Sequence, residues 1–199
     1  VVPNAGDIKF VPQRDIEYKQ EITDEDRTIL GKDVPDFTYG VNLSLQYKGF
    51  EFSMFGQGIS GTKVAFDVYG VHPFYHGQDS PRKYHLKRWT EENPNPHAAY
   101  PRIYSASSVH TTYNRNFSDY HLFDSDYFRF KTLSLGYTVP SATVKNWGLQ
   151  SLKVYVTGEN LFTVRADKKM EDFDPETPSG RGTDTRGTSS ISLGVNLTF

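Results

Sequence analysis

The stretch that most restricts the fold of this chain is its last ten residues, from Ser190 to Phe199. Apolar residues alternate strictly with small or polar ones here, so an extended chain would have one apolar face and one polar face. Both a soluble sheet and the closing strand of an outer-membrane barrel can end in this way. The apolar positions are Ile191, Leu193, Val195, Leu197 and Phe199.

Four further segments have the composition of strands, and the most regular of them runs from Phe37 to Tyr47. At about 3.3 Å per residue it would extend roughly 36 Å. Tilted by about 45°, it would cover the roughly 25 Å height of an outer-membrane apolar band. In another segment the alternation slips near Lys131, which predicts a β-bulge. The five expected strands are 37–47, 50–60, 127–137, 152–162 and 190–199.

The connectors between these strands differ in length from one end of the expected sheet to the other. Antiparallel order places the tight turn Lys48-Gly49 and the connector 138–151 at one end. It places the loops 1–36, 61–126 and 163–189 at the other end. Short turns opposite long loops, with aromatic residues at both rims, are typical of outer-membrane barrels. The expected membrane-interface aromatics are Tyr47, Phe50, Tyr137 and Phe199 at the short-turn end, and Phe37, Tyr39, Phe128 and Phe162 at the loop end.

The overall composition favours strands and turns and excludes several classes of protein. The hydrophobic fraction is 36%, below the usual share of about 45–50%, while aromatic residues reach 15%. A net charge of −2 gives no basic field for nucleic acid. The chain has no cysteine, and no apolar run approaches the roughly 18 residues of a membrane-spanning helix.

No residue pattern in the sequence predicts catalysis or metal binding. The HExxH, GxSxG, P-loop and dinucleotide motifs are absent. His72 and His76 are four residues apart, but Pro73 prevents them from sharing a helical face. The acidic clusters at 124–126 and 171–176 fit turn caps and solvated loops better than cation sites. We therefore expect no enzyme activity, no cofactor and no metal site.

A series of motifs resembles the C-terminal barrel of SusC/RagA-type TonB-dependent transporters, in the order of that family and over nearly the whole chain. GDIKF and DEDRTILG near the start also match. The stretch between these two, residues 11–23, lacks the spaced acidic residues that often form a calcium-like loop in the family. The main motifs are Pro35–Gly61, RWTEENP (Arg88–Pro94) with YPRIY (Tyr100–Tyr104), Ser125–Pro140, Ser151–Val164, DPET (Asp174–Thr177) and SLGVNLTF (Ser192–Phe199).

The resemblance implies an all-β fold, an antiparallel transmembrane β-barrel segment. Residues 1–199 would supply the last five strands of a 22-stranded barrel with long extracellular loops, and the plug domain would be absent from this chain. The family lies in the bacterial cell outer membrane of Bacteroidetes, in contact with its lipid. A SusD-like surface lipoprotein caps the loops, and the TonB complex energises the import of oligosaccharides or peptides.

Two functional classes remain open from the sequence. In the first, the chain is part of such a transporter, and the aromatic loop 61–126 faces the substrate or the partner lipoprotein. In the second, it is a soluble β-sheet carbohydrate-binding module or glycosidase domain, and the loop aromatics pack on one another. A need for detergent on extraction separates the two classes. The candidate substrate- or partner-facing residues are Tyr69, Tyr75, Tyr84, Trp89, Tyr100 and Tyr104.

Overall fold

The computed structural model describes residues 1–13, 22–65, 71–75, 80–177 and 187–199. The chain forms two compact units. We call the first, made of Val1–Asp33, Thr62–Ser125 and Asp167–Thr185, the loop unit. We call the second, made of Val34–Gly61, Asp126–Ala166 and Arg186–Phe199, the sheet unit.

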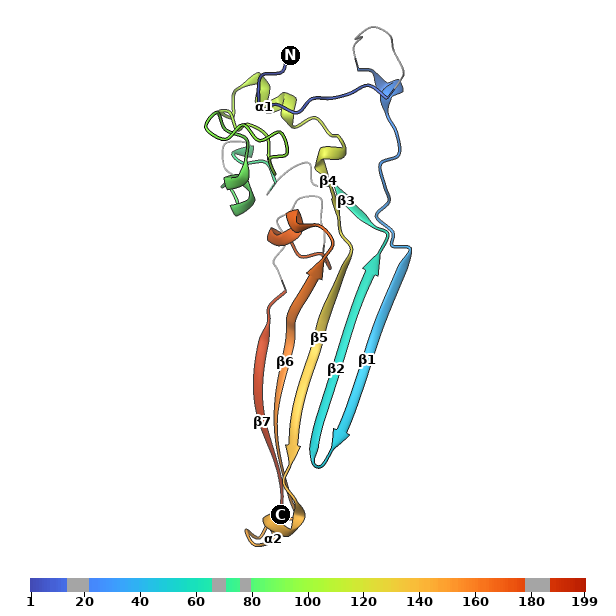
Figure 1. The fold of residues 1–199 in the computed structure, drawn as a ribbon, viewed down its shortest axis with the longest axis vertical. Coiled ribbons are helices and arrows are strands. Elements are labelled where there is room, and N and C mark those ends of the chain that lie inside the picture. The colour runs from blue at the N-terminus through green and yellow to red at the C-terminus, as the bar shows by residue number, and fades with distance from the viewer. Residues whose placement is uncertain (14–21, 66–70, 76–79, 178–186) are drawn as a thin grey trace. The chain divides into compact units, whose positions relative to one another are not determined.

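The sheet unit is a single antiparallel sheet of five strands in the order β1-β2-β5-β6-β7 (Figure 1). A short helix, α2 (Ser141–Lys145), lies in the connector between β5 and β6. The strand positions agree with those expected from the alternation, and β6 is longer than expected at both ends. The strands are β1 (Phe37–Tyr47), β2 (Phe50–Ser60), β5 (Tyr127–Thr138), β6 (Ser151–Arg165) and β7 (Ser190–Thr198).

The register of the sheet separates apolar from polar side chains completely at its centre. Residues paired across antiparallel strands point to the same face, and neighbours along a strand point to opposite faces. One row across all five strands is apolar, and the row beside it is polar. The apolar row is Leu45, Phe52, Leu135, Val156 and Leu193. The polar row is Ser44, Ser53, Ser134, Thr157 and Ser192.

The apolar face of the sheet unit is uncovered. Within the described residues of the sheet unit, no second layer of protein covers this face, and large aliphatic side chains are open on both edge strands. Exposure on this scale is unusual for a sheet that buries its apolar face against a core. The exposed fractions are 46% for Val41, 40% for Leu43, 83% for Leu193 and 58% for Val195.

The turn between β1 and β2 has the backbone that its sequence predicts. Lys48 and Gly49 both have positive φ, 46° and 86°. Positive φ at both central residues belongs to the two-residue hairpin turn whose twist matches the flanking strands. A Cβ atom at Gly49 would lie 2.7 Å from the carbonyl oxygen of Thr138, so glycine is also required by space.

The bulge expected near Lys131 is confirmed. The β5–β6 register shifts between Phe130 and Thr132, and in the β2–β5 ladder Phe55 pairs with Thr132 while the next residue, Gly56, pairs with Phe130. On the opposite strand, Asn160 has a φ of 50°, in the left-handed region. The Ser189 hydroxyl donates a hydrogen bond of 2.7 Å to the Asn160 carbonyl oxygen, and β7 pairing ends one residue before the bulge. The bulge therefore ends the β6–β7 ladder.

Replacing Asn160 tests whether its backbone conformation matters. We expect Asn160→Val to lower the free energy of unfolding by about 1–2 kcal/mol, because a β-branched residue is strained at positive φ. Asn160→Gly removes the amide contact to Thr188 (3.3 Å) but adopts this φ freely, so it should cost less. Urea unfolding of the purified protein measures both. Equal losses would show that the contact, not the backbone, matters.

The loop unit is built from short elements. β3 (Lys63–Ala65) pairs with β4 (Leu122–Asp124), and α1 (Val109–Asn114) is its α-helix in the described residues. None of the described helices is long and apolar enough to cross a membrane. The remaining elements are 3-10 turns: η1 (Asp24–Asp26), η3 (Lys83–Lys87), η4 (Asp119–His121) and η5 (Lys168–Asp172).

Candidate functional site

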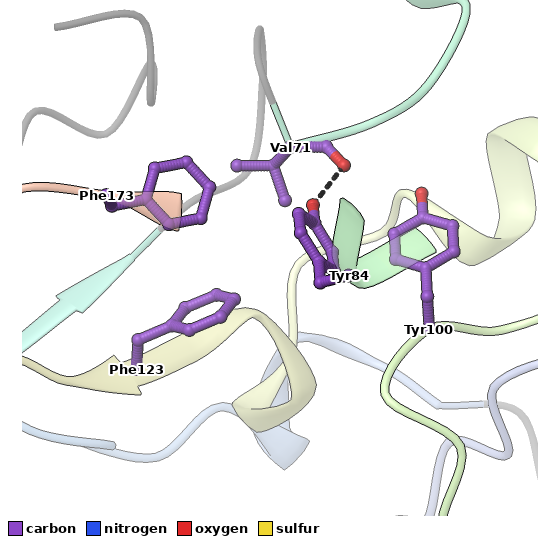
Figure 2. Packing of buried hydrophobic residues seen from close by; sticks show 5 residues of the cluster. All are labelled: Val71, Tyr84, Tyr100, Phe123 and Phe173. Carbon is purple, nitrogen blue, oxygen red and sulfur yellow. Dashed lines mark hydrogen bonds between the residues drawn. The ribbon is translucent and has the colours of Figure 1, made fainter. Parts of the chain in front are cut away.

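A cluster of buried aromatic residues forms the interior of the loop unit. Figure 2 shows Val71, Tyr84, Tyr100, Phe123 and Phe173 directed toward one another from well-separated parts of the sequence. The Tyr84 hydroxyl donates a hydrogen bond of 2.5 Å to the carbonyl oxygen of Val71. The Tyr100 hydroxyl lies 2.9 Å from Nδ1 of His72. Both hydroxyls are therefore satisfied inside the unit.

Two of the expected substrate-facing residues, Tyr84 and Tyr100, are buried in the loop unit, and their contact with a ligand stays a prediction. Their exposed fractions are 9% and 8%. Burial raises the pKa of both phenols far above the usual range, as expected for hydroxyls removed from water. The rings bury large areas with internal partners, so these tyrosines support the loop surface from beneath, as the alternative of loop self-packing requires.

Burial favours the neutral form of His85, and its backbone contacts select one tautomer. The Arg82 backbone N–H donates to Nδ1 (2.7 Å), so the remaining ring proton is on Nε2 and donates to the Val71 carbonyl oxygen (2.7 Å). Burial lowers the pKa of His85 below 6.5 and is the largest effect. The two backbone hydrogen bonds raise the pKa by less. The charge of Arg82 lowers it further, and that of Asp172 raises it. A second proton, on Nδ1, would point at the Arg82 backbone N–H, and the two hydrogen-bond donors would repel one another.

The stability of the loop unit should therefore fall in mild acid. Because the folded pKa of His85 is depressed, its stabilising effect is present above pH 6.5 and is lost as the pH falls from 6.5 through the folded value. We expect faster amide hydrogen exchange of residues 83–87 at pH 5.0 than at pH 7.5, after correction for intrinsic rates. The pH effect should shrink in His85→Gln. An unchanged pH effect in that variant would contradict the assignment.

The N-terminal segment is fastened to α1 through Asp7. Its carboxylate accepts hydrogen bonds from the Asn4 backbone N–H (2.7 Å) and the Asn114 amide (2.9 Å), and lies 2.8 Å from His110 Nδ1. Burial raises the pKa of Asp7, but these hydrogen bonds together outweigh it and hold the pKa below 3.8. Sequence reasoning did not identify this anchor. Ser108, whose hydroxyl accepts from the His110 N–H, was the available helix-start signal.

The other expected loop aromatics lie nearer the surface and contact arginines. The Arg102 guanidinium carbon lies 5.7 Å from the Trp89 ring centroid and 5.3 Å from that of Tyr104. The Arg115 guanidinium carbon lies 4.8 Å from the Tyr75 ring centroid. All three aromatic side chains are half-buried, so each has part of its surface open to a ligand or partner. Their role remains a prediction, and Tyr69 lies outside the described residues.

The expected membrane-interface aromatics contact one another between neighbouring strands and also across an intervening strand of the sheet unit. Phe50 and Tyr137 lie at the short-turn end with ring centroids 4.6 Å apart. Tyr39 and Phe128 stack at the other end, with centroids 6.0 Å apart. Six of the eight are exposed and two are half-buried, and their place at a membrane interface stays a prediction. The exposed six are Phe37, Tyr39, Tyr47, Phe50, Phe162 and Phe199; the half-buried two are Phe128 and Tyr137.

The acidic clusters hold turns together. Asp126 accepts a hydrogen bond from the Gly61 N–H (3.0 Å), and Asp174 accepts one from the Glu176 N–H (3.0 Å). Within the described part of the chain, no group of three or more histidine, aspartate or glutamate side chains is placed to hold a metal ion. His76 lies outside that part.

Two curated proteins of Formosa agariphila are similar to this chain. TonB-dependent receptor P26 is 30% identical over 175 residues, and TonB-dependent receptor P3 is 28% identical over 179 residues. The alignments cover 88% and 90% of this chain, which spans only 16% of the length of each relative. No family model matches the chain.

Two solved structures share the fold. They are those of the RagAB peptide transporter and of the RagAB peptide importer in its "closed-closed" state, each with a TM-score of 0.55. The identities are 24% and 23%, and each match covers 83% of this chain and 17% of the other. At these identities the likeness shows the fold alone.

These matches define the class: a segment with the fold of part of a transporter, related in sequence to TonB-dependent receptors. With the ordered motifs, they support a particular identification, a fragment of a SusC/RagA-type TonB-dependent transporter. The similar proteins are receptors and transporters, which are not enzymes, in agreement with the expectation from sequence.

Proposed function

We propose that this chain forms the C-terminal wall of an outer-membrane TonB-dependent transporter, with its apolar face against lipid and its polar face lining the lumen. The uncovered apolar face is the observation that carries the proposal. Side chains such as Leu193 are strongly exposed in a row that is apolar across all five strands. Lipid tails are the environment in which this exposure is favourable.

The polar face supports the same orientation. Lys153 on β6 forms an ion pair with Glu51 on β2, and Thr138 also donates to Glu51 (3.4 Å). The lysine crosses β5 above Gly136, where a Cβ atom would lie 2.9 Å from the lysine Cε. An ion pair on this face is stable beside water and unfavourable within hydrocarbon.

Further strands of the longer protein would complete the wall. Within the described residues, β1 and β7 each have one edge without a hydrogen-bonded neighbour. A sheet edge cannot face lipid, because its backbone N–H and C=O groups would have no partners there. The matched relatives are several times longer than this chain, and a protein of that length would have residues for those strands.

Residues 1–199 should therefore fail to form a stable membrane domain alone. We expect this piece, refolded into detergent or vesicles, to aggregate and to show no cooperative unfolding transition as a monomer. The full-length protein treated in parallel is the control. A monomeric piece that unfolds cooperatively would contradict the closed-wall proposal.

The imported cargo would be a glycan or a peptide, taken up with a SusD-like surface lipoprotein and energy from the TonB complex. The RagAB peptide importer shares the fold of this chain, and the half-buried loop aromatics suit either a sugar ring or a peptide. The alternative, a soluble carbohydrate-binding module or glycosidase domain, requires a layer of protein over the apolar face.

Fractionation of the full-length protein tests the choice. We expect it in the outer-membrane fraction, extractable only with detergent, and we expect uptake of its substrate to stop when TonB is deleted. Release into the soluble fraction without detergent would support the alternative. Outer-membrane location with uptake independent of TonB would contradict the transport mechanism alone.

A further inference from the structure

The loop unit contains an open pocket with two arginine side chains in its wall, here called the arginine pocket. It is lined by Arg102, Arg115, Tyr100, Tyr104 and Asn114, among others, and its cavity volume is about 20 Å³. Ligand sites for whole small molecules usually reach about 300–1,000 Å³. The arginine pocket therefore has room for one small functional group of a longer ligand.

Arg115 is held in place without a carboxylate partner. Its guanidinium packs over the Tyr75 ring and donates one hydrogen bond of 3.4 Å to the Pro73 carbonyl oxygen. Among the described residues, no carboxylate forms an ion pair with it. The side chain is half-buried, and its guanidinium has four further N–H donors. An anion in the arginine pocket would satisfy them.

Arg102 adds a second positive charge to the wall. It lies against the Trp89 and Tyr104 rings and forms an ion pair of 2.9 Å with Glu91. The Glu91 side chain is mostly exposed, so this ion pair is weakened by water. Arg102 therefore retains part of its attraction for an anion, while Arg115 provides the stronger contact.

The backbone that carries Arg115 is anchored. Arg115 directly follows α1, and the buried Asn114 amide holds both the Ile8 N–H (2.9 Å) and the Asp7 carboxylate (2.9 Å). A guanidinium fixed by stacking and by an anchored backbone loses little freedom on binding, which favours affinity.

We propose that the arginine pocket binds a carboxylate group of the transported ligand, with Arg115 as the principal contact. The inference rests on the proposed transport function and specifies the substrate as acidic. The planar guanidinium fork matches two oxygens of a carboxylate, and the half-buried Tyr104 provides surface for the adjoining part of the ligand.

Calorimetric titration of the purified full-length protein tests the inference with two pairs of probes. The first pair is N-acetyl-tetra-alanine and its C-terminal amide, and the second is cellobiouronic acid and cellobiose. At least one acid should bind ten times more tightly than its neutral partner, and the pair that responds identifies peptide or sugar as the source of the anion. Arg115→Gln should remove the preference, and Arg115→Lys should restore part of it.

A matched control is Arg27→Gln, which removes an exposed arginine of the same unit paired with Asp24. It should leave the preference for acids unchanged. Outer-membrane assembly of each variant is checked separately, so a failure of the transporter proposal is distinguished from a failure of the pocket. Equal binding of acid and neutral probes by the assembled wild type, no binding of either acid, or an unchanged preference in Arg115→Gln would overturn the inference.

Discussion

Leu193→Arg is expected to disrupt assembly of the protein in the outer membrane. Leu193 is central in β7, pairs with Val156, and belongs to the apolar row. If this face meets lipid, an arginine near the bilayer midplane costs about 2–4 kcal/mol. We expect less heat-resistant folded protein in the outer membrane and a lower urea midpoint in vesicles.

The neighbouring position provides the control. Ser192 is exposed on the same strand, pairs with Thr157 and points to the polar face. Ser192→Arg should assemble normally, because its charge would reach the water of the lumen. If the two arginine variants behave alike, or if Ser192→Arg is the more damaging, the assignment of the two faces is wrong.

Phe123→Ala is expected to loosen the loop unit without affecting the sheet unit. Phe123 is 5% exposed, contacts Phe173 with ring centroids 6.3 Å apart, and pairs with Val64 between β3 and β4. Removing a buried phenylalanine ring costs about 3–5 kcal/mol. In the full-length protein, amide exchange at 83–87 should become at least about 100-fold faster, since tenfold corresponds to about 1.4 kcal/mol.

Phe117→Ala is the matched control for this prediction. Phe117 belongs to the same unit but is 51% exposed and contacts His121 at 6.2 Å. Its loss should cost less than about 1 kcal/mol. Equal effects of the two substitutions would show that the cluster in Figure 2 does not stabilise the unit. A sheet unit that also fails to assemble in Phe123→Ala would show that the two units do not fold independently.

The strands of the sheet unit were predictable because their information is local. A period of two fixes which side chains share a face, Lys48-Gly49 fixes one register, and a single slip near Lys131 locates the bulge. The left-handed Asn160 on the partner strand was not predicted, because nothing in its own strand demands it.

The loop unit could not be predicted in the same way because its contacts join distant residues. Asp7 meets His110 across 103 positions, and no periodic pattern marks either of them. Tyrosine composition alone did not separate the buried Tyr84 and Tyr100 from the half-buried Tyr75. The arginine pocket depends on such pairings between distant residues. The sequence therefore predicted its aromatic residues as candidates but did not predict that two arginines lie beside them.

The two-residue turn at Lys48-Gly49 also has a kinetic consequence. It lets β1 and β2 associate as a local hairpin, an event of about 1–10 μs in isolated peptides. Joining β2 to β5 requires the ends of a much longer intervening segment to meet, at a greater loss of chain entropy. Biogenesis of this wall would then start from a preassembled ribbon, and its pace would be set by how quickly the segment between Ser60 and Tyr127 condenses.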